Sequence, residues 1–338
     1  MQLKLSIAKK VEILFFTTVI LYMGKALFIP LFLGLLIALI LYPVCKWLEN
    51  KGFNKSIAIA VCLLIVALLL MGLFFLFFWQ INIFIKDSPA IINKVKVILK
   101  DSQAQLVNAG ISVELQNSWL NKLGGNAGNA FNTMITTILS TLFTFFLVPI
   151  YTALFLYNRN TFIKFLKQVT PVAYAQQLGT ILQQTTVTYF KYIKGMVLVY
   201  IFVGILNSVG LMLLGVEHAF LFGMICAVMT IIPYVGIIIS ALLPISAIWL
   251  QTENIWYPIG VIAIFGFVQY LEANVIFPKV VGAQLNVSTL AMLIAIIAGG
   301  IIWGVAGMIL FIPFIAILKI VADNFTEWKP LGLLLGRE

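Results

Sequence analysis

The chain has 338 residues, of which 62% are hydrophobic and only 9% are charged, and its formal net charge is +10. A water-soluble protein carries charge on about 25% of its residues, so this composition excludes a soluble globule. Four uncharged runs are each 30 residues or longer; they cover 56–85, 123–158, 219–252 and 280–318. Because about 20 apolar residues are enough for a helix to cross a bilayer, the sequence predicts an all-α polytopic membrane protein.

Helices placed between the charged clusters predict about eight transmembrane segments. In chain order they are 12–28, 30–45, 56–80, 131–157, 195–214, 219–250, 255–276 and 289–319. We expect the first two segments, which meet just before Pro30, to form a tight hairpin. The domain organisation that follows is a group of three spans at 1–80, a polar segment at 81–130, a fourth span at 131–157, a segment at 158–194, a C-terminal bundle at 195–320 and a tail at 321–338.

The segment 81–130 is the only sizeable polar region of the sequence. Its apolar residues recur at helical spacing, and a glycine-rich and asparagine-rich stretch at 124–129 leads into the fourth span. This pattern predicts a small amphipathic helical segment outside the membrane. The segment 158–194 combines aromatic residues with lysines, which is typical of a helix that lies along the membrane interface.

Lysine and arginine gather in short connecting segments rather than in one stripe. The net charge therefore indicates membrane orientation and not a nucleic-acid partner. The basic segments lie at the N-terminus, at 46–55, at 159–194 and near the C-terminus. Counting the crossings places all of them on one side of the membrane. We therefore expect both termini in the cytoplasm and the segment 81–130 on the extracytoplasmic side.

Two uncharged runs are too long to be single transmembrane helices. The runs 219–252 and 280–318 contain 34 and 39 residues. As straight helices they would extend roughly 51 and 58 Å, whereas the hydrocarbon core is about 30 Å thick. Breakers lie near the middle of each run, at Pro233 with Gly236 and at Gly304 with Gly307. We expect two broken helical hairpins that enter from opposite sides, as in an inverted repeat.

The inventory of reactive side chains excludes the common catalytic and metal sites. The chain has one histidine, and it lacks the Gly-x-Ser-x-Gly, P-loop and Gly-x-Gly-x-x-Gly patterns. Cys45, Cys62 and Cys226 lie within apolar segments without metal-ligand spacing, so we interpret them as small buried hydrophobic residues. We expect no enzyme activity, no metal and no cofactor.

Several motifs resemble the successive signatures of one family. They are Tyr42-Pro43-Val44-Cys45-Lys46-Trp47-Leu48-Glu49, Tyr192-Ile193-Lys194-Gly195, Leu213-Leu214-Gly215-Val216, Ile232-Pro233-Tyr234-Val235-Gly236 and Gln269-x-x-Glu272-x-Asn274-x-x-x-Pro278-x-x-x-Gly282. Together they resemble the autoinducer-2 exporter family of PerM-like permeases over nearly the whole chain. One departure is Thr289, where the family often has a proline.

The resemblance implies a multi-pass transporter of the bacterial inner membrane. Members of that family are associated either with release of the quorum-sensing signal autoinducer-2 or with sodium/proton antiport. The residues of this sequence favour neither substrate over the other.

Candidate pathway residues lie in the broken hairpins and in the span between them. Glu272 is an ionisable residue in a membrane helix, where exposure to lipid costs on the order of 3 kcal/mol, so it is a functional candidate by default. The structural alternative is that Glu272 caps or pairs with a neighbouring helix or with Lys279. The predicted pathway residues are Pro233, Tyr234, Gly236, Gln269, Glu272, Asn274, Pro278, Gly282, Gly304 and Gly307.

Three functions of different classes stay open at this point. They are a permease for a small polar solute, an ion-coupled antiporter, and a membrane scaffold whose segment 81–130 binds a partner. The first two predict a polar pathway through Glu272 and the broken hairpins, whereas the scaffold predicts that only the segment 81–130 matters. We favour the permease. The expected partners are the lipid bilayer, a small polar solute or coupling ion, and further copies of the chain in a homo-oligomer, with no nucleic acid.

Overall fold

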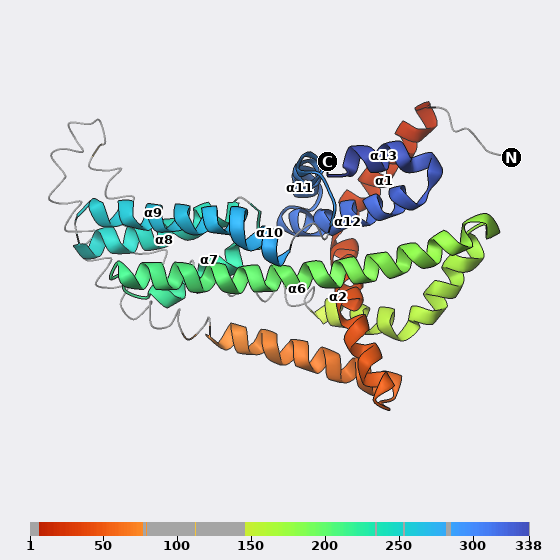
Figure 1. Ribbon diagram of the computed structural model, residues 1–338, viewed down its shortest axis with the longest axis horizontal. Coiled ribbons are helices and arrows are strands. Elements are labelled where there is room, and N and C mark those ends of the chain that lie inside the picture. The colour runs from red at the N-terminus through yellow and green to blue at the C-terminus, as the bar shows by residue number, and fades with distance from the viewer. Residues whose placement is uncertain are drawn as a thin grey trace.

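The structure is a computed structural model that describes residues 7–76, 79, 112, 146–233, 235–252, 254–281 and 285–337. These residues form helices joined by short turns, with one isolated antiparallel bridge between Val287 and Gly336. Five of the described helices are long and apolar enough to cross a membrane. The predicted class, an all-α polytopic membrane protein, is confirmed (Figure 1).

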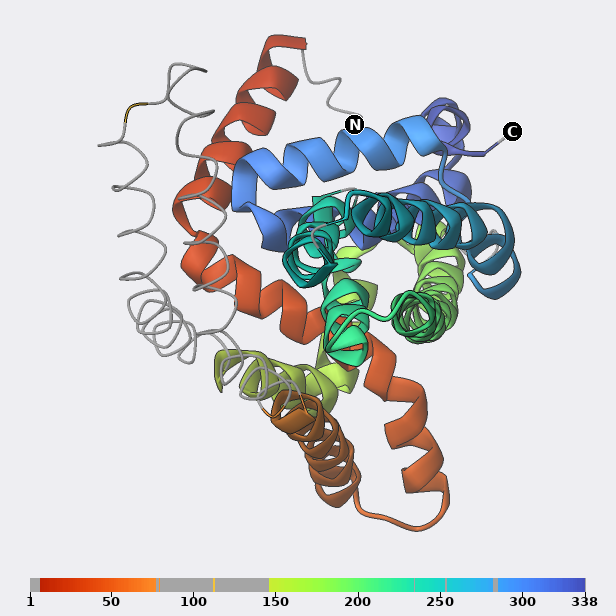
Figure 2. The same ribbon diagram turned by 90° about the vertical axis from the view of Figure 1, so that its left-hand side faces the viewer.

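The N-terminal pair of helices differs from the predicted hairpin. Helix α1 (Ile7–Met23) continues into α2 (Lys25–Asn50) through Gly24 alone. The Gly24 amide donates to the Ile20 carbonyl at 2.8 Å, and the Phe28 amide donates to the Gly24 carbonyl at 2.9 Å. The helical hydrogen bonds therefore run through the junction, and Figures 1 and 2 show one bent rod. The hairpin prediction was wrong because a reversal between helices needs a longer connection, of about 2–5 residues.

The chain reverses after α2 and enters the helix Lys55–Leu76. The reversal includes Gly52 at a positive φ of 98°, a conformation that glycine adopts at little cost. Cys45 of α2 and Cys62 of the next helix are buried in one small cluster, together with Leu156 from the helix at 146–169. The interpretation of the cysteines as buried small residues is confirmed, since Cys226 is buried as well.

The longest helix, α6 (Ala175–Leu213), organises the rest of the fold. It follows the short 3₁₀ helix η1 (Val172–Tyr174) and contains 39 residues, which corresponds to roughly 58 Å. This length exceeds a hydrocarbon core of about 30 Å. Residues 175–194, which we expected in a separate segment, are thus continuous with the following span.

The two predicted hairpins are present. The first consists of α7 (Ala219–Met229) and α8 (Val235–Thr252), which pack against each other. The second consists of α11 (Thr289–Trp303) and α12 (Val305–Asn324), and Gly304 turns the chain between them at φ 62° and ψ −142°.

The hairpins pack on different halves of α6. A Cβ atom on Gly204 of α6 would lie 2.9 Å from Ala227 of α7. At the other half of α6, the Asn324 amide donates to Gln184 at 2.9 Å. Figure 1 accordingly shows α7 and α8 along the C-terminal half of α6 and α11 and α12 beside its N-terminal half. The entry of the hairpins from opposite sides of the membrane remains a prediction.

Helix α9 (Trp256–Leu271) runs into a π-helical turn, η2 (Glu272–Ile276), and then into α10 (Phe277–Val280). This composite helix packs on α6 next to α8. It supplies the only charged residue of the predicted pathway.

The C-terminal residues fold back onto the bundle. They form η3 (Thr326–Trp328) and α13 (Lys329–Leu335), and the Ser288 amide donates to the Leu335 carbonyl at 2.7 Å. Tyr174 donates to the Glu327 carboxylate at 2.9 Å, and this hydrogen bond raises the pKa of the exposed Tyr174 hydroxyl. The hydrogen bond between Tyr174 and Glu327 therefore connects the C-terminal residues to the start of α6.

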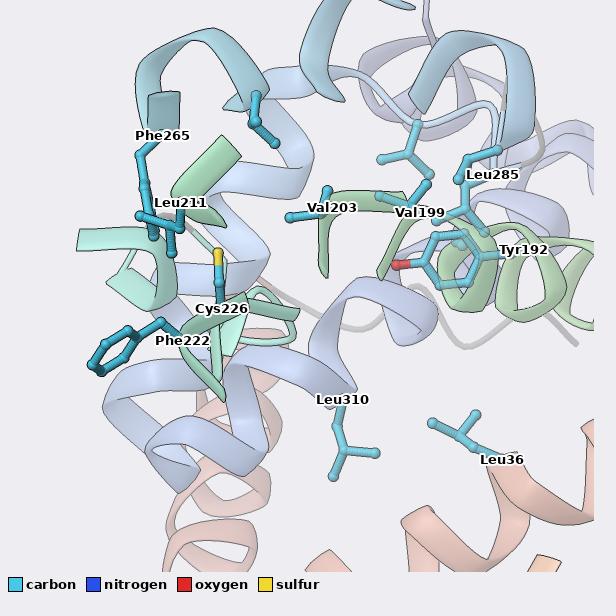
Figure 3. Packing of buried hydrophobic residues seen from close by; sticks show 14 of the residues in the cluster. Leu36, Tyr192, Val199, Val203, Leu211, Phe222, Cys226, Phe265, Leu285 and Leu310 are labelled. Carbon is cyan, nitrogen blue, oxygen red and sulfur yellow. The ribbon is translucent and has the colours of Figure 1, made fainter. Parts of the chain in front are cut away.

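The main core follows one face of α6. In Figure 3, Val199, Val203 and Leu211 extend along this helix, with Cys226 of α7 at one end of the row. The opposite surfaces of α8, α9 and the helix Lys55–Leu76 expose many large apolar side chains. Exposed apolar area on this scale is typical of a surface that faces lipid.

Candidate transport site

Glu272 lies where α9 changes from α-helical to π-helical geometry. Single π-helical turns interrupt the regular hydrogen-bond ladder and are frequent at functional sites. Gln269 precedes Glu272 by three residues, so both side chains share one face of the helix. Both are half-buried. The structure therefore keeps together the two polar residues that the motif had suggested.

One carboxylate oxygen of Glu272 has no partner in the part of the chain that the structure describes. Its Oε2 atom is buried and accepts no hydrogen bond from the described residues. Lys279, the expected structural partner, is exposed, and no ion pair between Glu272 and Lys279 occurs in the described part of the chain. The carboxylate lies instead within electrostatic reach of Tyr200 of α6 and Cys226 of α7.

Polar side chains that we had not selected from the sequence lie where α6, α7 and α8 pack together, within electrostatic reach of Glu272. We call Asn207, Cys226, Thr230 and Ser240 the α6–α8 polar cluster. Asn207 is fully buried, and its Nδ2 atom donates to the Val203 carbonyl at 2.9 Å and to the Cys226 sulfur at 3.4 Å. The hydroxyls of Thr230 and Ser240 lie beside the same thiol. Three separate helices thus contribute to the cluster.

The α6–α8 polar cluster contains oxygen acceptors beside the Asn207 amide and the Cys226 thiol. The Thr230 hydroxyl donates to the Cys226 carbonyl at 2.8 Å, and the Ser240 hydroxyl donates to the Ile237 carbonyl at 3.0 Å. Their remaining lone pairs stay available. The Oδ1 atom of Asn207 is buried and has no partner among the described residues. The arrangement favours a bound group that donates hydrogen bonds or carries positive charge.

The connection between α7 and α8 contains Pro233, which is half-buried. Gly236 is buried in the first turn of α8, and a Cβ atom there would overlap the Met229 carbonyl at the end of α7. The structure therefore gives Gly236 a packing role, because only a glycine lets the two helix ends approach this closely. Tyr234 lies outside the described residues.

The remaining predicted pathway residues are exposed, belong to the second hairpin or lie outside the described ranges. The Asn274 side chain is exposed and donates to the Tyr270 carbonyl of its own helix at 3.0 Å. Pro278 is exposed in α10, and Gly282 lies outside the described ranges. Gly304 and Gly307 belong to the second hairpin, where a Cβ on Gly307 would overlap the Gly299 carbonyl. These two glycines shape a helix crossing.

A sequence signal for the α6–α8 polar cluster existed. Asn207 and Ser208 interrupt an otherwise apolar span. Polar residues within a membrane helix are rare and often functional, so this pair could have been selected from the sequence. Cys226 carried no such signal, because its neighbours in sequence are apolar. Among the residues that the structure describes, no group of three histidine, cysteine or acidic side chains could hold a metal ion.

The helices, their breaks and their apolar surface define a polytopic membrane protein with buried polar groups inside a helical bundle. The sequence profile described as AI-2E family transporter matches residues 12–327. The chain therefore belongs to the AI-2E transporter family, and both the predicted family and the transporter class are confirmed.

Curated relatives cover most of the chain at low identity. YrrI of Bacillus subtilis is 24% identical over 325 residues, which cover 90% of this chain and 88% of YrrI. The AI-2 transport protein TqsA of Escherichia coli is 22% identical over 308 residues, which cover 91% of this chain and 89% of TqsA. A Thermotoga maritima protein is 34% identical over 148 residues, or 43% of each chain. YrrI and the Thermotoga protein have provisional names as transport proteins, whereas the name of TqsA specifies AI-2.

Proposed function

We propose that the chain is a permease that carries a small polar solute through the bundle of α6, α7, α8 and α9. The supporting observation is a pair of buried acceptors, Glu272 Oε2 and Asn207 Oδ1, that have no hydrogen-bond partner among the described residues. An unpaired polar group in an apolar membrane interior costs several kcal/mol. A solute that donates hydrogen bonds would recover this cost as it passes, which makes the acceptors suitable contacts for transient binding.

Autoinducer-2 is the first candidate substrate, moving outward as an exported quorum-sensing signal. Two arguments support it: the motif resemblance described above and the full-length similarity to TqsA, which is named for AI-2 transport. A bundle with these buried oxygen acceptors fits a small solute with several donors better than an anion.

Sodium/proton antiport is the second candidate. It is favoured by the orientation of Thr230 and Ser240, whose hydroxyls donate to their own helices and leave oxygen lone pairs available. Small hard cations prefer oxygen atoms as ligands. Glu272 would then be the carboxylate whose protonation alternates with cation binding.

The cellular setting belongs to the same proposal. The protein would lie in the bacterial inner membrane with the basic segments 46–55 and 159–194 and the C-terminus in the cytoplasm. The N-terminus was expected on the same side, but its side now depends on how the continuous rod of α1 and α2 crosses the membrane. It would assemble as a homo-oligomer within the bilayer, and neither an enzymatic reaction nor nucleic-acid binding would form part of its function.

Flux into proteoliposomes of the purified protein tests the proposal. Uptake of autoinducer-2 should exceed uptake by protein-free vesicles, and the Glu272→Gln variant should lower it. In the same vesicles, a sodium gradient should drive no proton movement. Sodium-driven proton movement without uptake of autoinducer-2 would favour the antiporter instead. If neither flux exceeds that of protein-free vesicles, both candidates are wrong.

A further inference from the structure

The end of α2 meets the helix at 146–169 in a cluster of basic and aromatic side chains that the proposed transport route does not use. We call it the Arg159 cluster; its charged members are Lys46, Glu49, Lys51, Lys55 and Arg159. Four cations and one carboxylate leave it with a net positive charge. Tyr42, Trp47 and Tyr157 are its aromatic members.

Arg159 forms the buried centre of the cluster. Its side chain is 13% exposed, and its Nη2 atom donates to both oxygens of Glu49, at 2.7 and 2.5 Å. The guanidinium lies 5.3 Å from the centre of the Tyr42 ring. Its Nη1 atom is buried and donates to no group in the described part of the chain. Because Nη1 is enclosed by protein, an external anion cannot contact it in this conformation, but the guanidinium charge still raises the positive potential of the cluster.

The lysines surround Arg159 with further positive charge. The Lys51 ammonium lies 3.8 Å from the centre of the Trp47 ring, and Lys55 donates to the Tyr157 carbonyl at 2.5 Å. Lys46 is exposed and lies at 3.9 Å from Glu49, whose carboxylate is already engaged by Arg159. Lys46 and Lys51 therefore remain available for a ligand at the surface of the cluster.

The position of the Arg159 cluster distinguishes a lipid headgroup from a free anion. The cluster lies where one membrane-spanning helix, α2, ends and the next, Lys55–Leu76, begins. Trp47 is 54% exposed, as expected for a ring at headgroup level. Ile57, Leu64 and Leu68 continue from the cluster as an exposed apolar surface on the second helix. Acyl chains can cover this surface while the phosphate contacts the basic side chains.

We propose that the Arg159 cluster binds the phosphate headgroup of an anionic phospholipid, with phosphatidylglycerol as the representative ligand. The exposed ammonium groups of Lys46 and Lys51 contact the phosphate, and Arg159 adds its positive charge from within the protein without touching the lipid. The acyl chains lie along the helix Lys55–Leu76. The lipid would lie beside the contacts that already join α2 to the helix at 146–169, which are the ion pair between Arg159 and Glu49 and the packing of Cys45 with Leu156.

Lipid titration of the purified full-length protein in detergent tests this proposal without any transport measurement. Phosphatidylglycerol should bind and raise Tm more than phosphatidylcholine does. The variant Lys46→Gln/Lys51→Gln should weaken phosphatidylglycerol binding by about tenfold or more, since each basic residue contributes to binding an anionic headgroup. Arg159→Lys should weaken it less, because lysine keeps the positive charge although it lacks the forked guanidinium that holds Glu49.

The matched control is Lys164→Gln/Lys167→Gln, which removes two exposed lysines from the helix at 146–169, outside the Arg159 cluster. It should bind phosphatidylglycerol like the parent. The same loss of affinity in the control and in Lys46→Gln/Lys51→Gln would indicate unspecific charge attraction and overturn the proposal. An equal rise in Tm with inorganic phosphate would overturn the lipid assignment in favour of a free anion. Parent-like binding in Lys46→Gln/Lys51→Gln would exclude the site even if Arg159→Lys fails to fold.

Discussion

At the scale of single residues, Glu272 has the strongest claim to a direct role in transport. It is half-buried in an apolar bundle, it begins a π-helical turn, and its Oε2 atom has no partner among the described residues. A carboxylate kept for packing alone would be expected to pair with a neighbouring donor. Its unpartnered oxygen is instead available to a passing donor or cation.

The Glu272→Gln variant should lower flux by about tenfold or more while the protein still folds, because the two side chains are nearly isosteric. Transport in proteoliposomes measures the effect. For an antiporter, the variant should also flatten the pH dependence, since a titrating group is removed; for a permease of a neutral solute, the pH profile should stay unchanged. Glu217→Gln, in an exposed turn, is the control. Parent-like flux in Glu272→Gln would assign Glu272 a structural role.

A second residue-scale prediction concerns Lys319 of α12, which is 6% exposed and pairs with Asp323 one turn later. Asp323→Ala leaves the buried ammonium without a counter-charge and should lower the free energy of unfolding by about 1–3 kcal/mol. The double variant Lys319→Met/Asp323→Ala should recover most of the loss. Unfolding in detergent measures both, and equal destabilisation in the single and double variants would contradict this account.

At the scale of elements, the second hairpin depends on a close helix crossing. A Cβ on Gly307 would overlap the Gly299 carbonyl, so Gly307→Ala should push α12 away from α11 and destabilise the protein by about 1–3 kcal/mol. Gly266→Ala in α9 is the matched control, because no atom lies within 4 Å of a Cβ there. It should leave stability unchanged or raise it slightly. Thermal unfolding of the two variants should separate them; similar Tm values would exclude the crossing as the cause.

The first hairpin combines packing with the proposed pathway. Gly236→Leu should abolish flux, but it should also lower the yield of folded protein, because even a Cβ at this position overlaps the Met229 carbonyl. Asn207→Leu separates the two effects better, since it replaces a buried amide with an apolar side chain of similar size. It should lower flux while the yield stays near that of the parent. Size-exclusion profiles and flux should be measured together, and full flux in Asn207→Leu would exclude the α6–α8 polar cluster from the pathway.

At the scale of the whole molecule, topology is the main prediction. The bend at Gly24 joins α1 and α2 end to end, so the side on which the N-terminus lies has to be measured separately from that of later segments. We expect Ser102→Cys, within 81–130 and outside the described residues, to react with a membrane-impermeant reagent on cells whose inner membrane is intact. The native cysteines are buried, which keeps the background low. Reaction only after that membrane is opened would reverse the predicted orientation.

Local sequence properties predicted the membrane class, the family and the two broken hairpins. Hydropathy is a property of the local sequence, and clusters of proline and glycine marked the breaks in both hairpins, so both could be read without tertiary structure. A single proline or glycine predicts less: Pro30 and Pro43 lie inside α2, and helical hydrogen bonds run through Gly24, close to the expected reversal. Trp303 donates to the Leu21 carbonyl at 2.8 Å across 282 positions, and such a contact is set by packing.

The composition of the candidate site was decided by tertiary structure. Glu272 and the residues around Pro233 were visible as polar or helix-breaking positions within apolar runs. The grouping of Asn207 with Cys226 depends on the packing of α6 against α7, and the ion pair between Arg159 and Glu49 joins residues 110 positions apart. Periodicity and composition describe the surroundings of each residue along its own helix. Partners on other helices depend on how side chains fill the space between them, which only the folded chain determines.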